Sequence, residues 1–392
     1  MTSLAHRIRT GIALSATAAA VVATSACGGS SSDTSPTTSF TGTIGQTDLS
    51  TVCPKTVTIQ TDWYPEAEHG HLYQLLGPNP TIDANAKKVS GPLFDNGSYT
   101  GVNVEIRSGG PAIGNQSVTS QMFQDDSILL GYVDQDQTIQ TSASKKTTAV
   151  FSPLNVSPQM IMWDPATYPQ VKTIADLKKV NATVLYFSGS TYMDYLTGAG
   201  VLNKAQIDGS YDGTPATFVA AGGKKAQQGY ASSEPYLYEN EVQGWKKPVA
   251  FQLVDAAGFP TYKSAIAVRS ADLDKDSPCL QKLVPVLQRA EVAYMTSPEA
   301  TNDLIVKVVS DFNSGWVYDK GQADFAVKQM KDLKLVANGP DNTIGAFDPS
   351  RVAHMIDITR PIFAQQKTPI ASDLTPEQVA TNKFLDKSIS LP

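Results

Sequence analysis

Short apolar runs alternate with helix signals along most of the chain after residue 55. Runs rich in β-branched residues, some with strict apolar–polar alternation, predict short strands. These strands fall at 57–61, 102–106, 127–132, 149–151, 159–163, 183–187, 249–254 and 263–269. Strands that alternate with helices predict an α/β protein with doubly wound parallel sheets.

Helix starts are marked by capping residues. Ser117 to Phe123 predicts a short helix, and Thr173 with Asp176 has the spacing of a capping box. Further starts are expected at Thr191, at Glu234-Pro235, and at each of Ser297-Pro298, Asp348-Pro349 and Thr375-Pro376. From residue 277 onward the pattern is mostly helical, so this tail is expected to pack back on the first lobe.

Two lobes are expected, because roughly 340 folded residues exceed the usual size of one core. We predict lobe 1 from residues 53–155 and 260–392, and lobe 2 from residues 156–259. The chain then crosses between lobes near 152–157 and near 258–263, which together would form a hinge.

The N-terminus has the features of a signal peptide over residues 1–26: a basic start, a short apolar run and small residues before Cys27. A cysteine at this place resembles the bacterial lipobox, although Thr24 stands where that motif usually has Leu. We expect Cys27 to carry lipid; plain secretion is the alternative. Residues 27–52 are mostly Gly, Ser, Thr, Asp, Pro and Gln, which predicts a flexible tether.

Composition narrows the function classes. Hydrophobic residues make up 41% and charged residues 17%, as in an ordinary globular protein, and no stretch after the tether is apolar enough to span a bilayer. The net charge of −6 argues against nucleic acid as a partner. Apart from Cys27 the chain contains only Cys53 and Cys279, which predicts one disulfide in an exported protein.

The densest group of candidate binding residues follows the first predicted strand. Asp62, Trp63, Tyr64, Glu66, Glu68, His69 and His71 fall within ten positions. A core does not favour so many ionisable groups, and a plain surface loop does not favour so many rings. Because ligands of doubly wound sheets bind beyond the carboxyl ends of strands, this stretch and residues 131–134 are expected to line a ligand cleft.

Three later segments add candidates on the second lobe and the hinge. Residues 188–192 form a hydroxyl-rich turn before a helix, where free N–H groups could meet a carbonyl, carboxylate or sulfonate oxygen. Glu234 is either a helix cap or a carboxylate presented to a ligand amine. The expected ligand-binding set is Trp63, Tyr64, His69, Tyr132, Asp134, Ser188, Ser190, Thr191, Tyr192, Glu234 and Tyr262. Trp163, Trp245 and Trp316 are expected to be packing residues.

Residues 61–73, TDWYPEAEHGHLY, resemble the opening motif of periplasmic solute-binding proteins of the thiamine-pyrimidine-precursor, nitrate, sulfonate and taurine group. Segments 127–134, 172–192 and 230–241 are similar to the same family. The resemblance implies a two-lobed type II periplasmic-binding-protein fold whose two lobes close on a small solute. It also implies an ABC permease as partner, no cofactor, and a monomer attached outside the cytoplasm to the cell membrane by lipid. Trp63 and His69 match pocket-lining residues of the pyrimidine-precursor branch, in which a Trp stacks on a flat heterocycle. Glu66 and the long segment 77–97 depart from the family pattern.

Three alternatives remain open. The solute could be a small sulfonate, nitrate or carboxylate rather than a heterocycle. A metal receptor could use Glu66, Glu68, His69 and His71, although no further His or Cys cluster completes a tetrahedral site. An enzyme of pyrimidine-precursor synthesis has a related fold but uses a cysteine-rich iron motif, which this sequence lacks; we therefore expect no catalytic residues.

Overall fold

The computed structural model describes residues 40–392. The predicted signal peptide and Cys27 lie outside the described residues. Within the described part of the chain, no helix is both long and apolar enough to cross a membrane.

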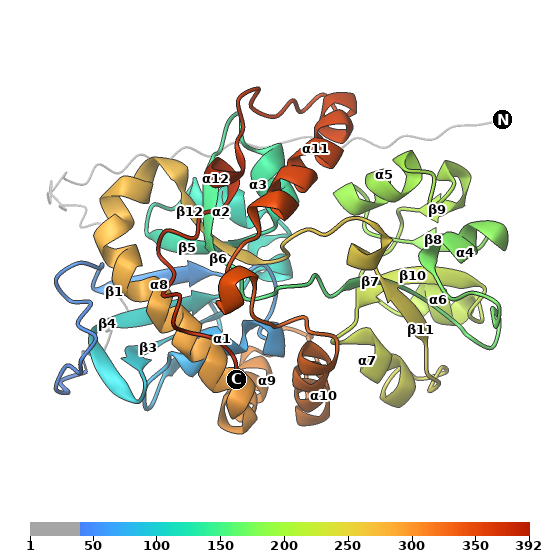
Figure 1. The fold of residues 1–392 in the computed structure, drawn as a ribbon. Coiled ribbons are helices and arrows are strands. Elements are labelled where there is room, and N and C mark those ends of the chain that lie inside the picture. The colour runs from blue at the N-terminus through green and yellow to red at the C-terminus, as the bar shows by residue number, and fades with distance from the viewer. Residues whose placement is uncertain (1–39) are drawn as a thin grey trace, which may run out of the picture. The chain divides into compact units, whose positions relative to one another are not determined.

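Two β-sheets organise the fold (Figure 1). The first has the strand order β2-β3-β4-β1-β5-β12-β6 and the second the order β11-β7-β10-β8-β9. We call the parts built on them lobe 1 and lobe 2. The strands of lobe 1 are β1 (Thr56–Gln60), β2 (Thr81–Asp83), β3 (Lys88–Asp95), β4 (Ser98–Arg107), β5 (Ile128–Val133), β6 (Thr147–Phe151) and β12 (Ala265–Arg269). Those of lobe 2 are β7 (Gln159–Trp163), β8 (Thr183–Leu185), β9 (Ile207–Asp208), β10 (Lys225–Tyr230) and β11 (Ala250–Leu253).

The predicted α/β fold class is confirmed, but both sheets are mixed rather than purely parallel. β4, β1 and β5 pair in parallel, whereas β12 runs antiparallel to β5 and β6. The reason is the return from lobe 2: β12 re-enters the first sheet from the opposite end. In lobe 2, β7 is likewise antiparallel to β10 and β11.

Helices cover both faces of each sheet. Those of lobe 1 are α1 (Gly70–Gln74), α2 (Val118–Met122), α3 (Gln135–Gln140), α8 (Leu273–Thr296), α9 (Glu299–Phe312), α10 (Lys320–Asp332), α11 (Pro349–Gln365) and α12 (Pro376–Val379). Those of lobe 2 are α4 (Ile174–Lys179), α5 (Thr191–Gly198), α6 (Ala216–Ala220) and α7 (Glu234–Asn240). The C-terminal helices pack against lobe 1 as expected, and α11 also contacts α5 of lobe 2.

Strand alternation divides the interior into separate cores. In β1, Val57 and Ile59 face the core that contains α1, α8 and α9. In β7, Ile161 and Trp163 face a second core shared with α4 and α5, while Met160 and Met162 face a third with Phe218 and Trp245. Trp163 and Trp245 are therefore packing residues, as predicted.

Residues 77–97 form an antiparallel extension at the edge of the first sheet, which the sequence did not predict. β3 pairs with both β2 and β4, and its register shifts between Pro92 and Phe94. Proline has no N–H to donate to a neighbouring strand, so a bulge at this position is expected. Because the segment has low strand propensity, the sequence did not predict β2 and β3.

The end of the predicted tether differs from the expectation. Leu49 is buried, its N–H donates to Thr100 O at 2.8 Å, and Ile44 forms a bridge with Tyr99. The buried Leu49 side chain, a few backbone bonds and hydrogen bonds that link Thr47 to Asp95 and Asp48 to Lys282 attach residues 44–52 to lobe 1. The predicted disulfide is confirmed: Cys53, just before β1, is bonded to Cys279 on α8.

Candidate functional site

Asp62, directly after β1, lies at the centre of a polar network at the edge of lobe 1. Its Oδ1 is 3.0 Å from Nε2 of His69, and its Oδ2 accepts a hydrogen bond of 2.6 Å from Ser264. Burial alone would raise the pKa of Asp62, but the interactions with His69, Lys263 and Ser264 together outweigh it and the pKa is lowered. A Cβ at Gly109 would lie 2.2 Å from Thr61 O, so glycine is needed for this close approach.

A buried ion pair lies beside this network. Asp134, which follows β5, pairs with Nζ of Lys263 and accepts a 2.9 Å hydrogen bond from the Ser264 N–H. The antiparallel pairing of β12 with β5 places residues 263–264 next to Asp134. Burial lowers the pKa of Lys263, but the charges of Asp134, Tyr230 and Asp62 together outweigh it, so the pKa lies well above its usual value.

Lobe 2 contributes groups from the carboxyl end of β10. The Tyr230 ring lies 5.9 Å from the Lys263 Nζ, and Ser232 donates a hydrogen bond to Glu68 of lobe 1. Glu234 begins α7 and accepts a 2.6 Å hydrogen bond from the Tyr230 N–H. These contacts bring the two lobes together. We call the following set the inter-lobe cluster: Asp62, Glu66, Glu68, His69, Asp134, Tyr230, Ser232, Glu234, Lys263 and Ser264.

Carboxyl groups outnumber cations in the inter-lobe cluster. Burial, followed by the charges of Glu68 and Asp62, raises the pKa of Glu66 well above its usual value. Burial also raises the pKa of Glu68, and it raises that of Glu234 to about 7. Carboxyls with raised pKa values in one place indicate a site that would gain from a positive charge.

A group of aromatic rings lies next to the carboxyls. The ring centroids of Trp63 and Trp316 are 6.2 Å apart edge to face, and those of Tyr64 and Trp316 are 5.9 Å apart and stacked. Tyr318 stacks on Trp316 at 6.4 Å, and its hydroxyl accepts a hydrogen bond from the Ala67 N–H, between Glu66 and Glu68. We call Trp63, Tyr64, Trp316 and Tyr318 the ring group. Trp63 and Trp316 remain partly exposed.

The helix start after β8 provides the lobe 2 side. The Tyr192 hydroxyl donates a 2.8 Å hydrogen bond to Gln228 Oε1, which also accepts from the Phe187 N–H. Thr191 hydrogen-bonds Asp136 of lobe 1, but burial dominates and raises the pKa of Asp136 to about 6. This turn therefore contacts lobe 1 through a hydroxyl.

Tyr132 packs against the ring of His69. Its ring meets the His69 ring edge-on at 5.0 Å and stacks on that of His71 at 6.1 Å. The Tyr132 hydroxyl is 3.0 Å from His71 Nε2, and His71 Nδ1 is 2.8 Å from Glu291 on α8. All of these groups are buried, so Tyr132 positions His69 and is itself shielded from solvent.

The structure brings most of the expected residues together, but not all. Trp63, Tyr64, His69, Asp134, Thr191, Tyr192 and Glu234 lie in or beside the inter-lobe cluster and the ring group. Ser188 is exposed on the turn, and the Ser190 hydroxyl donates to Phe187 O. Tyr262 is buried against Phe347 and Arg351, and its hydroxyl accepts from the Asp348 N–H.

Sequence reasoning missed Lys263, Ser264, Tyr230 and Ser232. Trp316, which was expected to be a packing residue, does pack against the core of lobe 1 and also stacks in the ring group. A signal existed for Lys263: the strand that returns from a lobe crossing begins at the lobe boundary. Trp316 lies in the irregular segment between α9 and α10, where no periodic pattern indicates a role.

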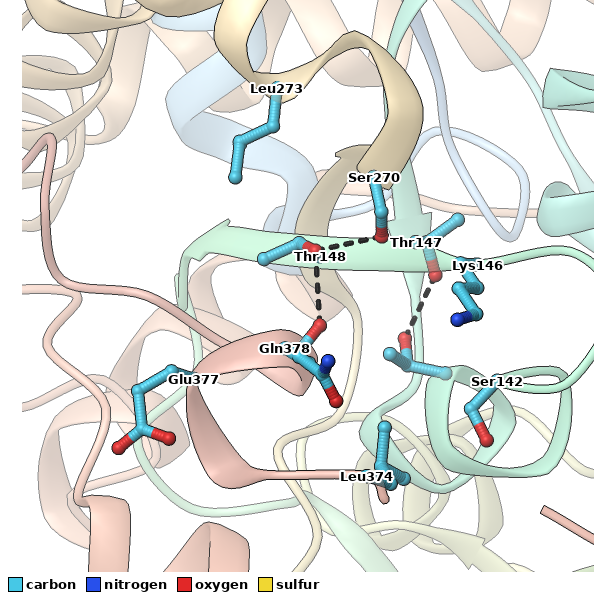
Figure 2. A pocket seen from close by; sticks show the side chains of 10 residues that line it. Ser142, Lys146, Thr147, Thr148, Ser270, Leu273, Leu374, Glu377 and Gln378 are labelled. Carbon is cyan, nitrogen blue, oxygen red and sulfur yellow. Dashed lines mark hydrogen bonds between the residues drawn. The ribbon is translucent and has the colours of Figure 1, made fainter. Parts of the chain in front are cut away.

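The hollow of about 240 Å³ drawn in Figure 2 lies elsewhere, between α3, β6 and α12 of lobe 1. Its hydroxyls bond each other: Thr148 bonds Ser270 at 2.8 Å and Gln378 O at 3.0 Å. Hydrogen-bonded side chains therefore line this hollow. In residues 40–392, no group of three or more His, Cys, Asp or Glu side chains is arranged to hold a metal ion.

No protein-family model and no curated protein sequence matches this chain. Solved structures do resemble it. The periplasmic aliphatic sulphonate binding protein SsuA from Escherichia coli is 17% identical, with a TM-score of 0.51 over 81% of this chain and 89% of that one. The alkanesulfonate-binding protein SsuA from Xanthomonas axonopodis pv. citri, bound to MOPS, is 12% identical, with a TM-score of 0.51 over 84% and 98%.

A third structure is the zinc-bound ligand binding component of an ABC-type import system from Staphylococcus aureus. It is 11% identical, with a TM-score of 0.50 over 84% of this chain and all of its own, 100%. These neighbours differ in what they bind, so the likeness concerns architecture. The chain has the periplasmic binding protein fold.

Proposed function

We propose that this chain is an extracytoplasmic solute-binding protein of an ABC import system, which captures a small aromatic heterocycle between its lobes and delivers it to a membrane permease. The observation that carries the proposal is the inter-lobe cluster. Asp62 and His69 at the end of β1 face Tyr230 and Glu234 at the end of β10, and the partly exposed Trp63 lies beside them. Opening of the lobes would expose both halves to a solute.

The ring group supports a flat ligand. A planar ring can stack on the partly exposed Trp63 or Trp316, and such contacts contribute about 0.5–1.5 kcal/mol beyond burial. Hydrogen bonds that the ligand donates to charged groups such as Asp62 would orient it, each contributing about 1.5–3 kcal/mol. The inter-lobe cluster and the ring group offer groups that can bind a ligand, and we assign no residue a catalytic role.

A small sulfonate is the second candidate, because the E. coli and Xanthomonas neighbours are sulfonate-binding proteins. The charges disfavour it here. Lys263 is paired with Asp134, and Asp62, whose pKa is lowered, is ionised and would repel an anion. An anion would need a compensating cation that the cluster does not supply.

The assembly would work at the membrane. The basic and apolar N-terminal segment followed by Cys27 supports a lipid-anchored receptor outside the cytoplasm. The two crossings between the sheets, 152–158 and 254–264, would be the hinge.

A thermal-shift screen tests this function with three solute classes: aminopyrimidines, small sulfonates and small carboxylates. A true ligand at about 100 times its Kd adds about 2.7 kcal/mol of stability. Trp63→Ala is the control, because it should abolish the shift while the protein stays folded. If no class shifts the unfolding temperature, the proposed function is wrong; a shift that persists in Trp63→Ala removes Trp63 from the site.

A further inference from the structure

Arg351, in the first turn of α11, contacts both chain crossings between the lobes (Figure 1). Its guanidinium donates hydrogen bonds to Asn155 O in the first crossing and to Pro260 O and Thr261 O in the second, the last at 2.9 Å. The Arg351 side chain is only 15% exposed. One largely buried side chain therefore joins two segments that lie far apart in the sequence.

Backbone hydrogen bonds show where the first crossing changes lobes. The Val156 N–H donates to Leu335 O of lobe 1 at 3.1 Å. Two residues later, Pro158 O accepts a 2.9 Å hydrogen bond from the Ala231 N–H of lobe 2. A rotation of one lobe against the other must be absorbed between these attachments, at Ser157, because the attached residues move with their lobes.

The second crossing changes lobes within an equally short stretch. The Phe259 ring packs on Tyr195 of α5 in lobe 2, with 5.6 Å between the ring centroids. The Tyr262 N–H already donates to the side chain of Gln135 on α3 of lobe 1 at 3.0 Å. Only residues 260–261 lie between these attachments, and Arg351 binds both of their carbonyl groups. We call Ser157, Pro260 and Thr261 the pivot residues.

Arg351 also reaches lobe 2 directly. Its Nη2 lies 3.5 Å from Oδ2 of Asp255, in the short helix η4 (Asp255–Ala257) that packs on β11. The lobes touch in this arrangement, since Ser232 of lobe 2 bonds Glu68 of lobe 1. Because Arg351 moves with lobe 1 and Asp255 with lobe 2, their ion pair belongs to the closed arrangement.

The position of the guanidinium is fixed from several sides. Its carbon lies 3.8 Å from the centroid of the Tyr262 ring. The Tyr262 hydroxyl accepts a 2.7 Å hydrogen bond from the Asp348 N–H, and Asp348 in turn caps the start of α11. A planar guanidinium with five N–H donors can hold several carbonyl groups at once, whereas the compact ammonium group of lysine cannot span them.

We propose that Arg351 is the positioning residue of the hinge: it holds the pivot residues of both crossings in the geometry of the closed arrangement and so favours closed lobes in the free protein. The inference rests on the proposed function, in which the lobes open and close around a solute. Loss of the guanidinium should shift the free protein toward an open arrangement.

Two measurements on the full chain without ligand test this. Small-angle X-ray scattering should give a larger radius of gyration for Arg351→Lys than for wild type. Hydrogen exchange should be at least about threefold faster in the peptides that cover 152–158 and 254–264. Asp255→Asn leaves the carbonyl contacts intact and should change both measurements in the same direction, but less.

Arg360→Lys is the matched control, because it makes the same change further along α11. Residues 40–392 provide no hydrogen bond or ion pair for the Arg360 side chain. This variant should match wild type in both measurements. Near-UV circular dichroism checks that every variant is folded, and Asp255→Asn keeps the test decisive if Arg351→Lys does not fold.

Ligand binding shows whether the hinge geometry matters for capture. A hydroxymethyl-aminopyrimidine should bind Arg351→Lys about fivefold more weakly than wild type, because a smaller fraction of the protein is closed. The loss should appear mainly as faster release, measured by stopped-flow fluorescence. A saturating probe should restore the wild-type radius of gyration, which a merely local loosening of the crossings would not predict.

The outcomes separate this inference from the proposed function. Unchanged scattering and exchange in both Arg351→Lys and Asp255→Asn, or an equal change in Arg360→Lys, overturn the inference and leave the receptor function standing. Open lobes with unchanged probe affinity overturn the role of Arg351 in capture. If the probe and the other solute classes fail to bind the wild type, the proposed function is wrong, and the ligand-free measurements alone still decide whether Arg351 holds the hinge.

Discussion

The two lobes contribute differently to the inter-lobe cluster. In lobe 1 the polar groups hold each other: His69, Asp62 and Ser264 form one connected set, and Lys263 with Asp134 adjoins it. In lobe 2, Glu234 is held by one backbone N–H, and Ser232 bonds Glu68 of the other lobe. In the proposed receptor, lobe 1 would therefore present a pre-organised half-site, whereas the half-site of lobe 2 would be completed when the lobes close.

The largest expected effect comes from the disulfide that stabilises lobe 1. The double substitution Cys53→Ser and Cys279→Ser should lower the free energy of unfolding by about 2–5 kcal/mol, because the unfolded chain regains loop freedom. Denaturant titration measures it. Ligand affinity should stay within about twofold, because the bond lies away from the inter-lobe cluster. A large affinity loss in a folded variant would show that lobe 1 is not pre-organised on its own.

The pH dependence of the free energy of unfolding tests the environment of Glu234 in lobe 2. Its pKa is raised from 4.5 to about 7, so ionising it in the folded state is unfavourable. The stability it contributes is present below its unfolded pKa and is lost as pH rises through about 7. Glu234→Gln should therefore flatten the decline between about pH 5 and 8 and be about 1–3 kcal/mol more stable than wild type near pH 8.

Chemical unfolding at several pH values checks this expectation, with the exposed Glu239→Gln as control. Gln can still accept the Tyr230 N–H, so the start of α7 is retained. Identical pH profiles for wild type and Glu234→Gln would mean that Glu234 is not buried against other carboxyls.

Trp63→Ala tests the half-site of lobe 1. It should weaken ligand binding at least about tenfold, because it removes a ring face beside Asp62. The thermal unfolding temperature of the free protein should change little, since the ring is partly exposed. Unchanged affinity by calorimetry would place the ligand away from β1.

The smallest expected effect on ligand affinity comes from a single hydrogen bond between the two lobes. Gln366, the C-cap residue of α11, donates a 2.7 Å hydrogen bond to Asp194 on α5, an exposed contact between the lobes. Gln366→Ala should weaken ligand affinity by no more than about threefold, because an exposed hydrogen bond contributes about 0.5 kcal/mol. An effect above tenfold would mean that this contact controls closure.

The sequence predicted the architecture well where the signal was local. A β-branched run located β1 and a short apolar run located β5, and the rule that ligands bind beyond strand ends pointed to Asp62 and Asp134, which both lie in the inter-lobe cluster. Capping residues located α4 and α11. Residues separated by long stretches were harder: the contact between Asp134 and Lys263 depends on the antiparallel return of β12, which no local pattern specifies.

Two further differences from the sequence predictions, at Tyr262 and Leu49, have the same physical reason: burial by residues that lie far away in the chain. Tyr262 has a large ring near a crossing, as a ligand contact would, but Arg351 and Phe347 cover it. Leu49 is one apolar residue in a polar run, and its burial depends on the edge of a sheet that forms later in the chain. Single-residue anchors of this kind cannot be recognised from composition.

The attachment of residues 44–53 determines how mechanical force would enter the molecule. A pull on the N-terminal chain first meets the backbone bonds to β4 and then, through Cys53, the long helix α8. The covalent link passes the load to α8 before it can peel β1 from the sheet. A receptor pulled from this end would thus resist shear at lobe 1, while lobe 2 carries no tension and remains free to swing.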